Sequence, residues 1–199
     1  MKLNAKKYIQ RLAKKYSTPQ KVQAFLRAMP YNREKKIKTL RSAYSALKAG
    51  TAHCFEASFI AALLLEQNGY PTTVMSFESQ DGLDHVIFVF QKRGLWGAVA
   101  RSRDEGLHGR KPVYKSLRDL AWSYYDPYVD KTGKITAFQL ANLDESNSDW
   151  RYSSRNVWKA ENYLLELPHR KLKSSKKYYQ KLHSRYLKHG PMPKQKNWW

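Results

Sequence analysis

The only cysteine, Cys54, and a later histidine, His85, are the residues of this sequence whose types and spacing could do chemistry. Cys54 follows Gly50 and Thr51 and opens a long apolar segment, so we expect it in the first turn of a helix. There the outward N–H groups and the helix dipole favour an anion, which stabilises a thiolate. His85 begins an apolar run, a predicted strand, and could accept the thiol proton. The pair therefore predicts thiol-based acyl transfer.

A third group should orient the imidazole, and hairpin geometry indicates where to find it. If residues 93–94 form a two-residue turn, strand pairing places Ser102 opposite His85. Asp104 lies two residues further, on the same face of the strand, and would sit diagonal to His85. We rank Asp104 first and Ser102 second. Asp126, which could arrive from a loop, is third.

Each of these residues also has a structural interpretation without catalysis. Cys54 could be a small buried hydrophobe, His85 an exposed strand residue, and Asp104 a partner of a neighbouring arginine in a loop. Asp84 should point to the opposite face of the strand from its neighbour His85. His53 should face elsewhere on the turn and form local hydrogen bonds. A metal site from Cys54, His53 and His85 lacks a second thiol or regular histidine spacing, so no metal and no cofactor is predicted.

The elements that must position these residues follow from hydrophobic spacing and from turn residues. The helix after Thr18 has Pro19 at its first position, Gly50 ends another, and residues 54–67 are apolar nearly all round, as in a buried central helix. Expected helices cover residues 4–16, 19–29, 33–48, 54–67, 116–125, 156–166 and 174–188. Expected strands cover residues 72–77, 85–90, 95–101 and 135–141. Residues 102–114 are expected to form a long polar loop, and the last residues to be mobile.

Charge divides the 199 residues into three parts and predicts the domain organisation. The net charge is +21, with 37 Lys and Arg against 16 Asp and Glu. Residues 1–49 contribute +13 and residues 167–199 contribute +10, whereas residues 50–166 contribute −2. We therefore expect basic N-terminal helices at 1–49, a core domain at 50–166 and a basic, aromatic C-terminal tail at 167–199. The basic ends suit nucleic acid or another polyanion, or serve solubility.

Cysteine use and hydropathy limit the class of protein further. A single cysteine excludes an internal disulfide and a structural zinc site built from several thiolates. No stretch approaches the roughly 18 apolar residues of a membrane span, and the amphipathic start is not a signal peptide. We therefore expect a cytoplasmic, soluble protein.

Several elements together resemble the transglutaminase-like superfamily. They are the segment Thr51–Cys54, the apolar helix, the exit Gly69-Tyr70-Pro71, the strand from His85 and the return strand with Leu95-Trp96. The resemblance covers residues 45–105, about a third of the chain. It implies an α+β fold with a papain-like core, in which a central helix carrying the cysteine packs on a small antiparallel sheet.

The same resemblance implies a nucleophile at Cys54 and a base at His85, with an Asp at the end of the return strand. Residues 97–102 hold no acid there, and the first acid is Asp104. The sequence leads to two hypotheses. One is a cysteine-dependent amide hydrolase or acyltransferase that acts on a protein or peptide amide. The other is a catalytically silent module of the same fold that binds nucleic acid or another polyanion through its basic ends.

Overall fold

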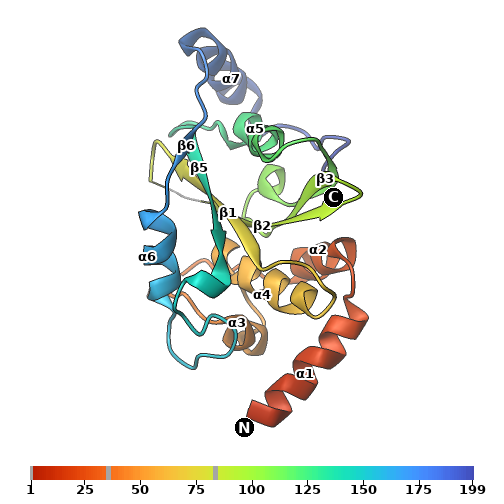
Figure 1. The fold of residues 1–199 in the computed structure, drawn as a ribbon. Helices are drawn as coiled ribbons and strands as arrows, with labels where there is room; N and C mark the ends of the chain where they lie inside the picture. The colour runs from red at the N-terminus through yellow and green to blue at the C-terminus, as the bar shows by residue number, and fades with distance from the viewer. Residues whose placement is uncertain (1, 35–36, 83–84) are drawn as a thin grey trace.

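The fold is of the α+β class, as predicted, in a computed structural model that describes residues 2–34, 37–82 and 85–199. In this part of the chain, seven α-helices accompany one six-stranded antiparallel sheet (Figure 1). The helices are α1 (Lys2–Lys15), α2 (Pro19–Ala28), α3 (Ala43–Ala49), α4 (Cys54–Glu66), α5 (Leu117–Tyr128), α6 (Trp158–Glu166) and α7 (Lys176–His189). The side chains of residues 2 and 3, and Asp84 altogether, lie outside the description.

The N-terminal helices pack around α4, which is the buried centre of the helical layer. Thr18 caps α2 by accepting a hydrogen bond from the N–H of Lys21, and Pro19 is the first residue of that helix, as predicted. Gly50 ends α3 with a positive φ of 67°, which glycine adopts without strain. Residues 55–65 of α4 are all buried, which confirms the helix expected from its continuous apolar run.

The helix expected over residues 33–48 is wrong for its first part, because among the described residues of this range the helix is confined to Ala43–Ala49. Residues 35 and 36 lie outside the described ranges. Ile37, an apolar residue in the first part of this range, is 76% exposed. The backbone before α3 instead donates to side chains: the N–H of Thr39 to Glu34, that of Leu40 to Asn156 and that of Arg41 to Glu56. These bonds replace the helical ladder, so local spacing alone could not predict the segment.

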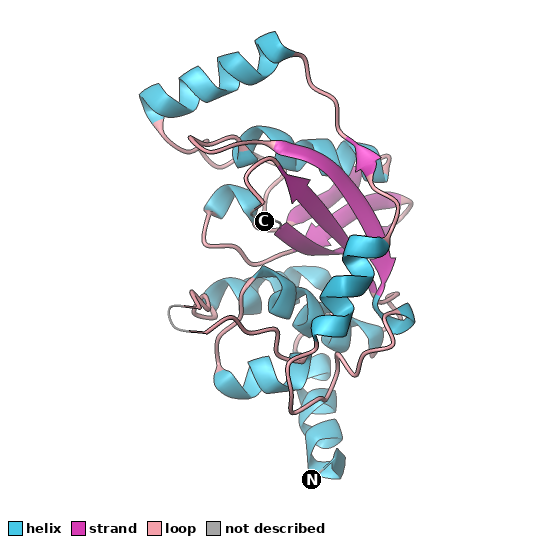
Figure 2. Ribbon diagram, turned by 90° about the vertical axis from the view of Figure 1, so that its left-hand side faces the viewer, coloured by secondary structure: helices cyan, strands magenta, loops and turns pink. Residues whose placement is uncertain are grey.

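The sheet has strand order β4-β3-β2-β1-β5-β6, and every neighbouring pair is antiparallel. The strands are β1 (Thr73–Ser79), β2 (His85–Lys92), β3 (Leu95–Val99), β4 (Arg110–Tyr114), β5 (Ile135–Asn142) and β6 (Arg170–Lys171). Along β2, Phe88 and Phe90 belong to the core shared with α4, whereas Ile87 and Val89 belong to the core shared with α5. The sheet is thus covered on both faces (Figure 2).

Two expectations about the C-terminal half are corrected. The polar loop expected over residues 102–114 contains a short 3₁₀ helix, η1 (Glu105–Leu107), and then β4. The last residues were expected to be mobile, but Trp198 is only 5% exposed and pairs with Arg110 in an isolated β-bridge. The Trp198 indole is therefore buried with the core, although it belongs to the basic C-terminal segment. No helix in the described ranges has the length and apolar character needed to cross a bilayer.

Candidate active site

Cys54 is the first residue of α4 and is half-buried. Hydrogen bonds hold the chain just before it: the N–H of Ala52 donates to Pro30 at 3.3 Å, and the N–H of Asn32 donates to Ala52 at 3.2 Å. One turn into the helix, the Ser58 hydroxyl bonds the carbonyl oxygens of both Cys54 and Val86, each at 3.0 Å. This contact ties the start of α4 to the start of β2, the strand that begins with His85.

His53 is the N-cap of α4 and forms a capping box with Glu56. Its Nδ1 accepts from the N–H of Phe55 at 3.3 Å, and Glu56 accepts from the N–H of His53 at 3.2 Å. The other ring nitrogen, Nε2, lies 2.9 Å from the carbonyl oxygen of Thr39. The sequence suggested a local hydrogen-bonding role for His53, which is confirmed, but its expected direction away from the thiol is wrong because the ring contacts Cys54.

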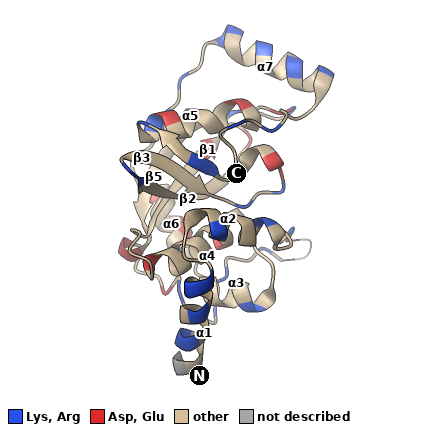
Figure 3. Cartoon of the chain, turned by 90° about the vertical axis from the view of Figure 1, so that its right-hand side faces the viewer, with Lys and Arg blue, Asp and Glu red and all other residues tan. Residues whose placement is uncertain are grey.

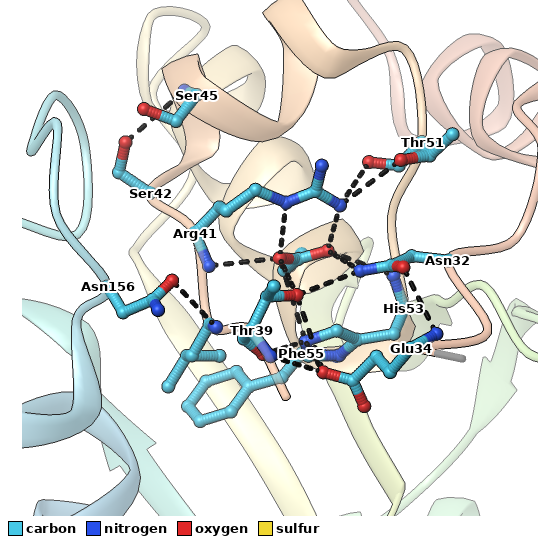
Figure 4. Close-up of polar contacts among 12 residues, drawn as sticks. Asn32, Glu34, Thr39, Arg41, Ser42, Ser45, Thr51, His53, Phe55 and Asn156 are labelled. Carbon is cyan, nitrogen blue, oxygen red and sulfur yellow. Dashed lines mark hydrogen bonds and ion pairs between the residues drawn. The ribbon is translucent and has the colours of Figure 1, made fainter. Parts of the chain in front are cut away.

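Glu56 is fully buried and is the anionic centre of this cap (Figure 4). It accepts from Arg41 Nε at 2.7 Å and Arg41 Nη2 at 2.8 Å, and also from Thr39 and Asn32 side chains. Burial by itself would raise the pKa of Glu56, but the hydrogen bonds and charge of Arg41, with the charge of His53, hold that pKa below its ordinary value. A buried carboxylate therefore belongs to the first turn of α4, two residues after Cys54, with Oε1 at 3.7 Å from His53 Nε2.

His85 is 4% exposed, and its Nε2 lies 2.8 Å from the carbonyl oxygen of Leu107. A carbonyl can only accept, so Nε2 carries the hydrogen and Nδ1 is the nitrogen left with a lone pair that can accept a proton. The ring lies between Phe77 and Tyr124, with ring-centre distances of 6.2 and 6.1 Å. This tautomer is the one in which Nδ1 can accept the thiol proton.

The Cys54 thiol interacts with the imidazoles of His53 and His85, and these interactions set its acidity. Burial would raise the pKa of Cys54, but hydrogen bonds from His53 and His85, with their charges, hold it well below the ordinary thiol value. Burial would lower the pKa of His53, but its contact with the Cys54 thiolate and the charge of Glu56 raise it to about 9. The two shifts are opposite sides of one thiolate–imidazolium interaction. His53 Nδ1 can accept from Phe55 or donate to the thiolate, but not both at once.

Tyr31 occupies the third side of the thiol. The phenol oxygen faces the backbone N–H of Cys54, and burial together with the Cys54 charge raises the tyrosine pKa, so the phenol stays neutral. The Arg101 guanidinium stacks over the Tyr31 ring at 5.6 Å. That N–H is the donor that an acyl oxygen would need, and the phenol O–H lies beside it.

The partner of His85 Nε2 is the carbonyl of Leu107, and not Ser102 or Asp104, the residues expected to orient the ring. The predicted register is confirmed, since Lys92 pairs with Leu95, but the ladder stops at Val99 and does not extend to Ser102. Ser102 is buried and accepts from the N–H of Asp104 at 3.2 Å. Asp104 is exposed and pairs with Arg103 at 3.3 Å, which is the alternative interpretation of that residue.

Asp126, the third-ranked residue, accepts from the hydroxyl of Tyr178 at 2.8 Å instead of approaching His85. The group that does contact His85 is a main-chain carbonyl, for which no side-chain signal exists. His53 and Glu56 could have been found, because their spacing is that of a capping box. Among the described residues, no three His, Cys, Asp or Glu side chains are placed to hold a metal ion.

The basic helices α1 and α7 lie at opposite ends of the molecule (Figures 1 and 3). On α1 the exposed cations are Lys6, Lys7, Arg11, Lys14 and Lys15. On α7 they are Lys176, Lys177, Lys181 and Lys188. The two helices therefore form separate positive surfaces. Neither a scan against models of known protein families nor a search of curated proteins matched the chain.

Proposed function

We propose that the protein is a transglutaminase-like thiol enzyme in which Cys54 attacks an amide or ester carbonyl and His85 manages the proton. The observation that carries this proposal is the arrangement of helix start, strand start and carbonyl. Cys54 begins α4, the Ser58 hydroxyl bonds the carbonyls of Cys54 and Val86 and so brings the start of β2 to it, and His85 Nε2 lies 2.8 Å from the carbonyl oxygen of Leu107. The order of the elements, with a cysteine helix followed by antiparallel strands of which the second begins with the histidine, supports the superfamily assignment.

The chemistry balances with the residues present. The Cys54 thiolate forms a bond to the carbonyl carbon, and the carbonyl electron pair moves onto oxygen, near the N–H of Cys54 and the hydroxyl of Tyr31. When the oxyanion collapses, the amine leaves and takes the proton held on His85 Nδ1, which leaves a thioester. Water or a second amine then attacks the thioester, gives a proton to His85 and releases the Cys54 thiolate, which restores the starting pair. Water makes the protein a hydrolase; an amine makes it an acyltransferase.

The neutral carbonyl on His85 distinguishes this site from one with a carboxylate orienter. A hydrogen bond to a charged group contributes about 1.5–3 kcal/mol and a neutral one about 0.5–1.5 kcal/mol. The hydrogen bond that holds the His85 ring is therefore about 1 kcal/mol weaker than a bond to an aspartate would be. His53, beside the buried Glu56, supplies a second cation for the thiolate and offsets this difference.

The rate of Cys54 alkylation by iodoacetamide as a function of pH tests the pair directly. We expect the rate to follow a group titrating well below pH 8, and His85→Ala to move that titration upward. Cys54→Ser is the control for labelling elsewhere. An alkylation rate that follows the titration of an ordinary thiol in the unchanged protein would refute the proposal.

Acyl transfer needs its own assay. Incubation with p-nitrophenyl acetate should release one equivalent of nitrophenol in a burst and add one acetyl group to the peptide containing Cys54, as measured by mass spectrometry. Cys54→Ser should give neither signal. A reactive thiol without an acetyl adduct would argue against acyl chemistry. A reducing compartment such as the cytoplasm would keep this thiol free.

The charged surface of α1 favours a second candidate, binding of nucleic acid or another polyanion. Lys7, Arg11 and Lys14 line one shallow hollow on this helix, whose described sequence has no acidic residue. Neutralising several phosphates makes affinity fall steeply with salt. Filter binding of single-stranded RNA, measured between about 50 and 200 mM salt, should show that fall in affinity. Substitution of the three residues by glutamine should remove the fall. No binding at the lower salt would exclude the idea.

A further inference from the structure

The loop that carries the Leu107 carbonyl, residues 102–109, has one turn of 3₁₀ helix as its only regular structure. Its position nevertheless sets the imidazole of His85, because Nε2 has this carbonyl as its partner. What holds the loop is therefore part of the site.

Arg110, directly after the loop, is the first of the groups that hold it. Its side chain is fully buried, and its acceptors are main-chain carbonyls and one hydroxyl. Nη2 donates to Gly106 at 2.7 Å and Nη1 donates to His108 at 2.7 Å, while Ser123 of α5 accepts at 3.1 Å through its carbonyl. A buried cation without these acceptors would be very costly, so the loop carbonyls are organised around it. The carbonyl between the first two, that of Leu107, faces His85 instead.

The last two residues close over this cluster from the other side. The Arg110 guanidinium lies 4.6 Å from the ring centre of Trp198 and 3.9 Å from the ring centre of Tyr124. A Cβ atom on Gly106 would come within 3.3 Å of Trp198, so the loop passes directly against the indole. Trp199 bonds the carbonyl of Ala98 through its indole N–H at 3.0 Å.

We propose that Arg110 and Trp198 are positioning residues for the base His85. Arg110 gathers the carbonyls on either side of Leu107, and Trp198 covers the cation and presses on Gly106, so that the Leu107 carbonyl stays on Nε2. This inference rests on the proposed function of His85 and deepens it: the chain segment around residue 198 controls the acidity of the thiol from a position that does not contact it.

The test combines the tautomer of His85 with the pH profile of the thiol. In ¹⁵N-labelled protein, long-range ¹H–¹⁵N spectra distinguish the Nε2–H from the Nδ1–H form of His85. We expect a single Nε2–H form in the Cys54→Ser protein, where no thiolate holds a second proton on Nδ1, and a mixture of both forms when Trp198→Ala or Arg110→Lys is added to it. Cys54 alkylation near neutral pH should become about five- to tenfold slower in these variants, because one hydrogen bond to the imidazole is weakened.

Matched variants separate positioning from general destabilisation. Trp158→Ala removes a 38% exposed tryptophan from α6, and Arg118→Lys changes an exposed arginine of α5 that bonds Lys171. Both should keep the tautomer and the profile. If Trp198→Ala does not fold, Trp198→Phe retains a ring over Arg110 and should give a smaller shift in the same direction.

The outcomes distinguish this inference from the proposed function. Variants that lose stability but keep the His85 tautomer and the alkylation profile overturn the positioning role. An ordinary thiol titration in the unchanged protein instead overturns the proposed function. In that case the tautomer measurement still decides whether Arg110 and Trp198 set the imidazole.

Discussion

Glu56→Gln is the substitution with the clearest consequence, because it removes a charge from the buried centre of the α4 cap. The Glu56 side chain has no exposure and accepts from Arg41 at 2.7, 2.8 and 2.9 Å, counting the Arg41 main-chain N–H, and from the N–H of His53 at 3.2 Å. Glutamine has the same shape but keeps only one acceptor oxygen, and its amide N–H₂ would face the donors of Arg41.

The expected loss in the free energy of unfolding is about 3 kcal/mol. Breaking a buried ion pair by removing one partner costs about 3–5 kcal/mol. The lower end applies because the Arg41 side chain keeps 21% exposure, so water can reach the charge left behind. Urea unfolding followed by tryptophan fluorescence measures this quantity.

Glu66→Gln is the matched control on the same helix. Glu66 also accepts from two nitrogens of an arginine, Nε and Nη2 of Arg151, but its side chain is 17% exposed and that arginine has a second partner in Asp144 at 2.7 Å. The loss there should be about 1 kcal/mol or less. Equal losses at the two sites would refute the reasoning that burial and cap geometry make Glu56 the dominant group.

The sign of the pH dependence gives a second check. The fold depresses the pKa of Glu56, so its contribution to stability is present above the unfolded value of about 4.3 and is lost as pH falls through the folded value. The stability difference between the unchanged protein and Glu56→Gln should therefore shrink below about pH 4. A gap that stays constant down to pH 2 would contradict a charged Glu56.

Two further predictions concern the cap and the loop. His53→Gln should move the titration of the Cys54 thiol upward by about one pH unit. The effect of this substitution on stability in urea should be present below about pH 6.5 and should vanish as pH rises through about 9, the raised pKa of His53. A thiol titration unchanged by the substitution would exclude His53 from the thiolate pair. Gly109→Ala should cost about 2–3 kcal/mol, because its Cβ would lie 2.0 Å from Gln23 Oε1 and 2.5 Å from the carbonyl oxygen of Ala98. Gly50→Ala meets no atom within 4 Å and pays only for its φ of 67°, about 1 kcal/mol, so thermal melts that rank these two in the reverse order would contradict the packing argument.

The elements with strong local patterns were predictable from the sequence. The cap at Thr18, the end at Gly50, the apolar helix from Cys54 and the hairpin register at Lys92 and Leu95 all agree with the structure. Each depends on residues within a few positions of one another, where backbone preference and hydrophobic spacing decide the outcome. The prediction for the segment before α3 was wrong because the N–H groups of this segment donate to side chains from distant parts of the chain, which local spacing does not reveal.

The candidate site divides in the same way. The sequence by itself determined that a lone thiol begins a buried helix and that a histidine begins a strand, because these follow from local pattern. Only the tertiary structure decided what surrounds them: a main-chain carbonyl of Leu107 on His85, the His53 ring on the thiol, and a loop held by Arg110 and Trp198. A carbonyl is present at every residue, and a contact between residues 106 and 198 has no local signature. Such partners are selected by packing and by the cost of leaving a buried cation or imidazole unsatisfied.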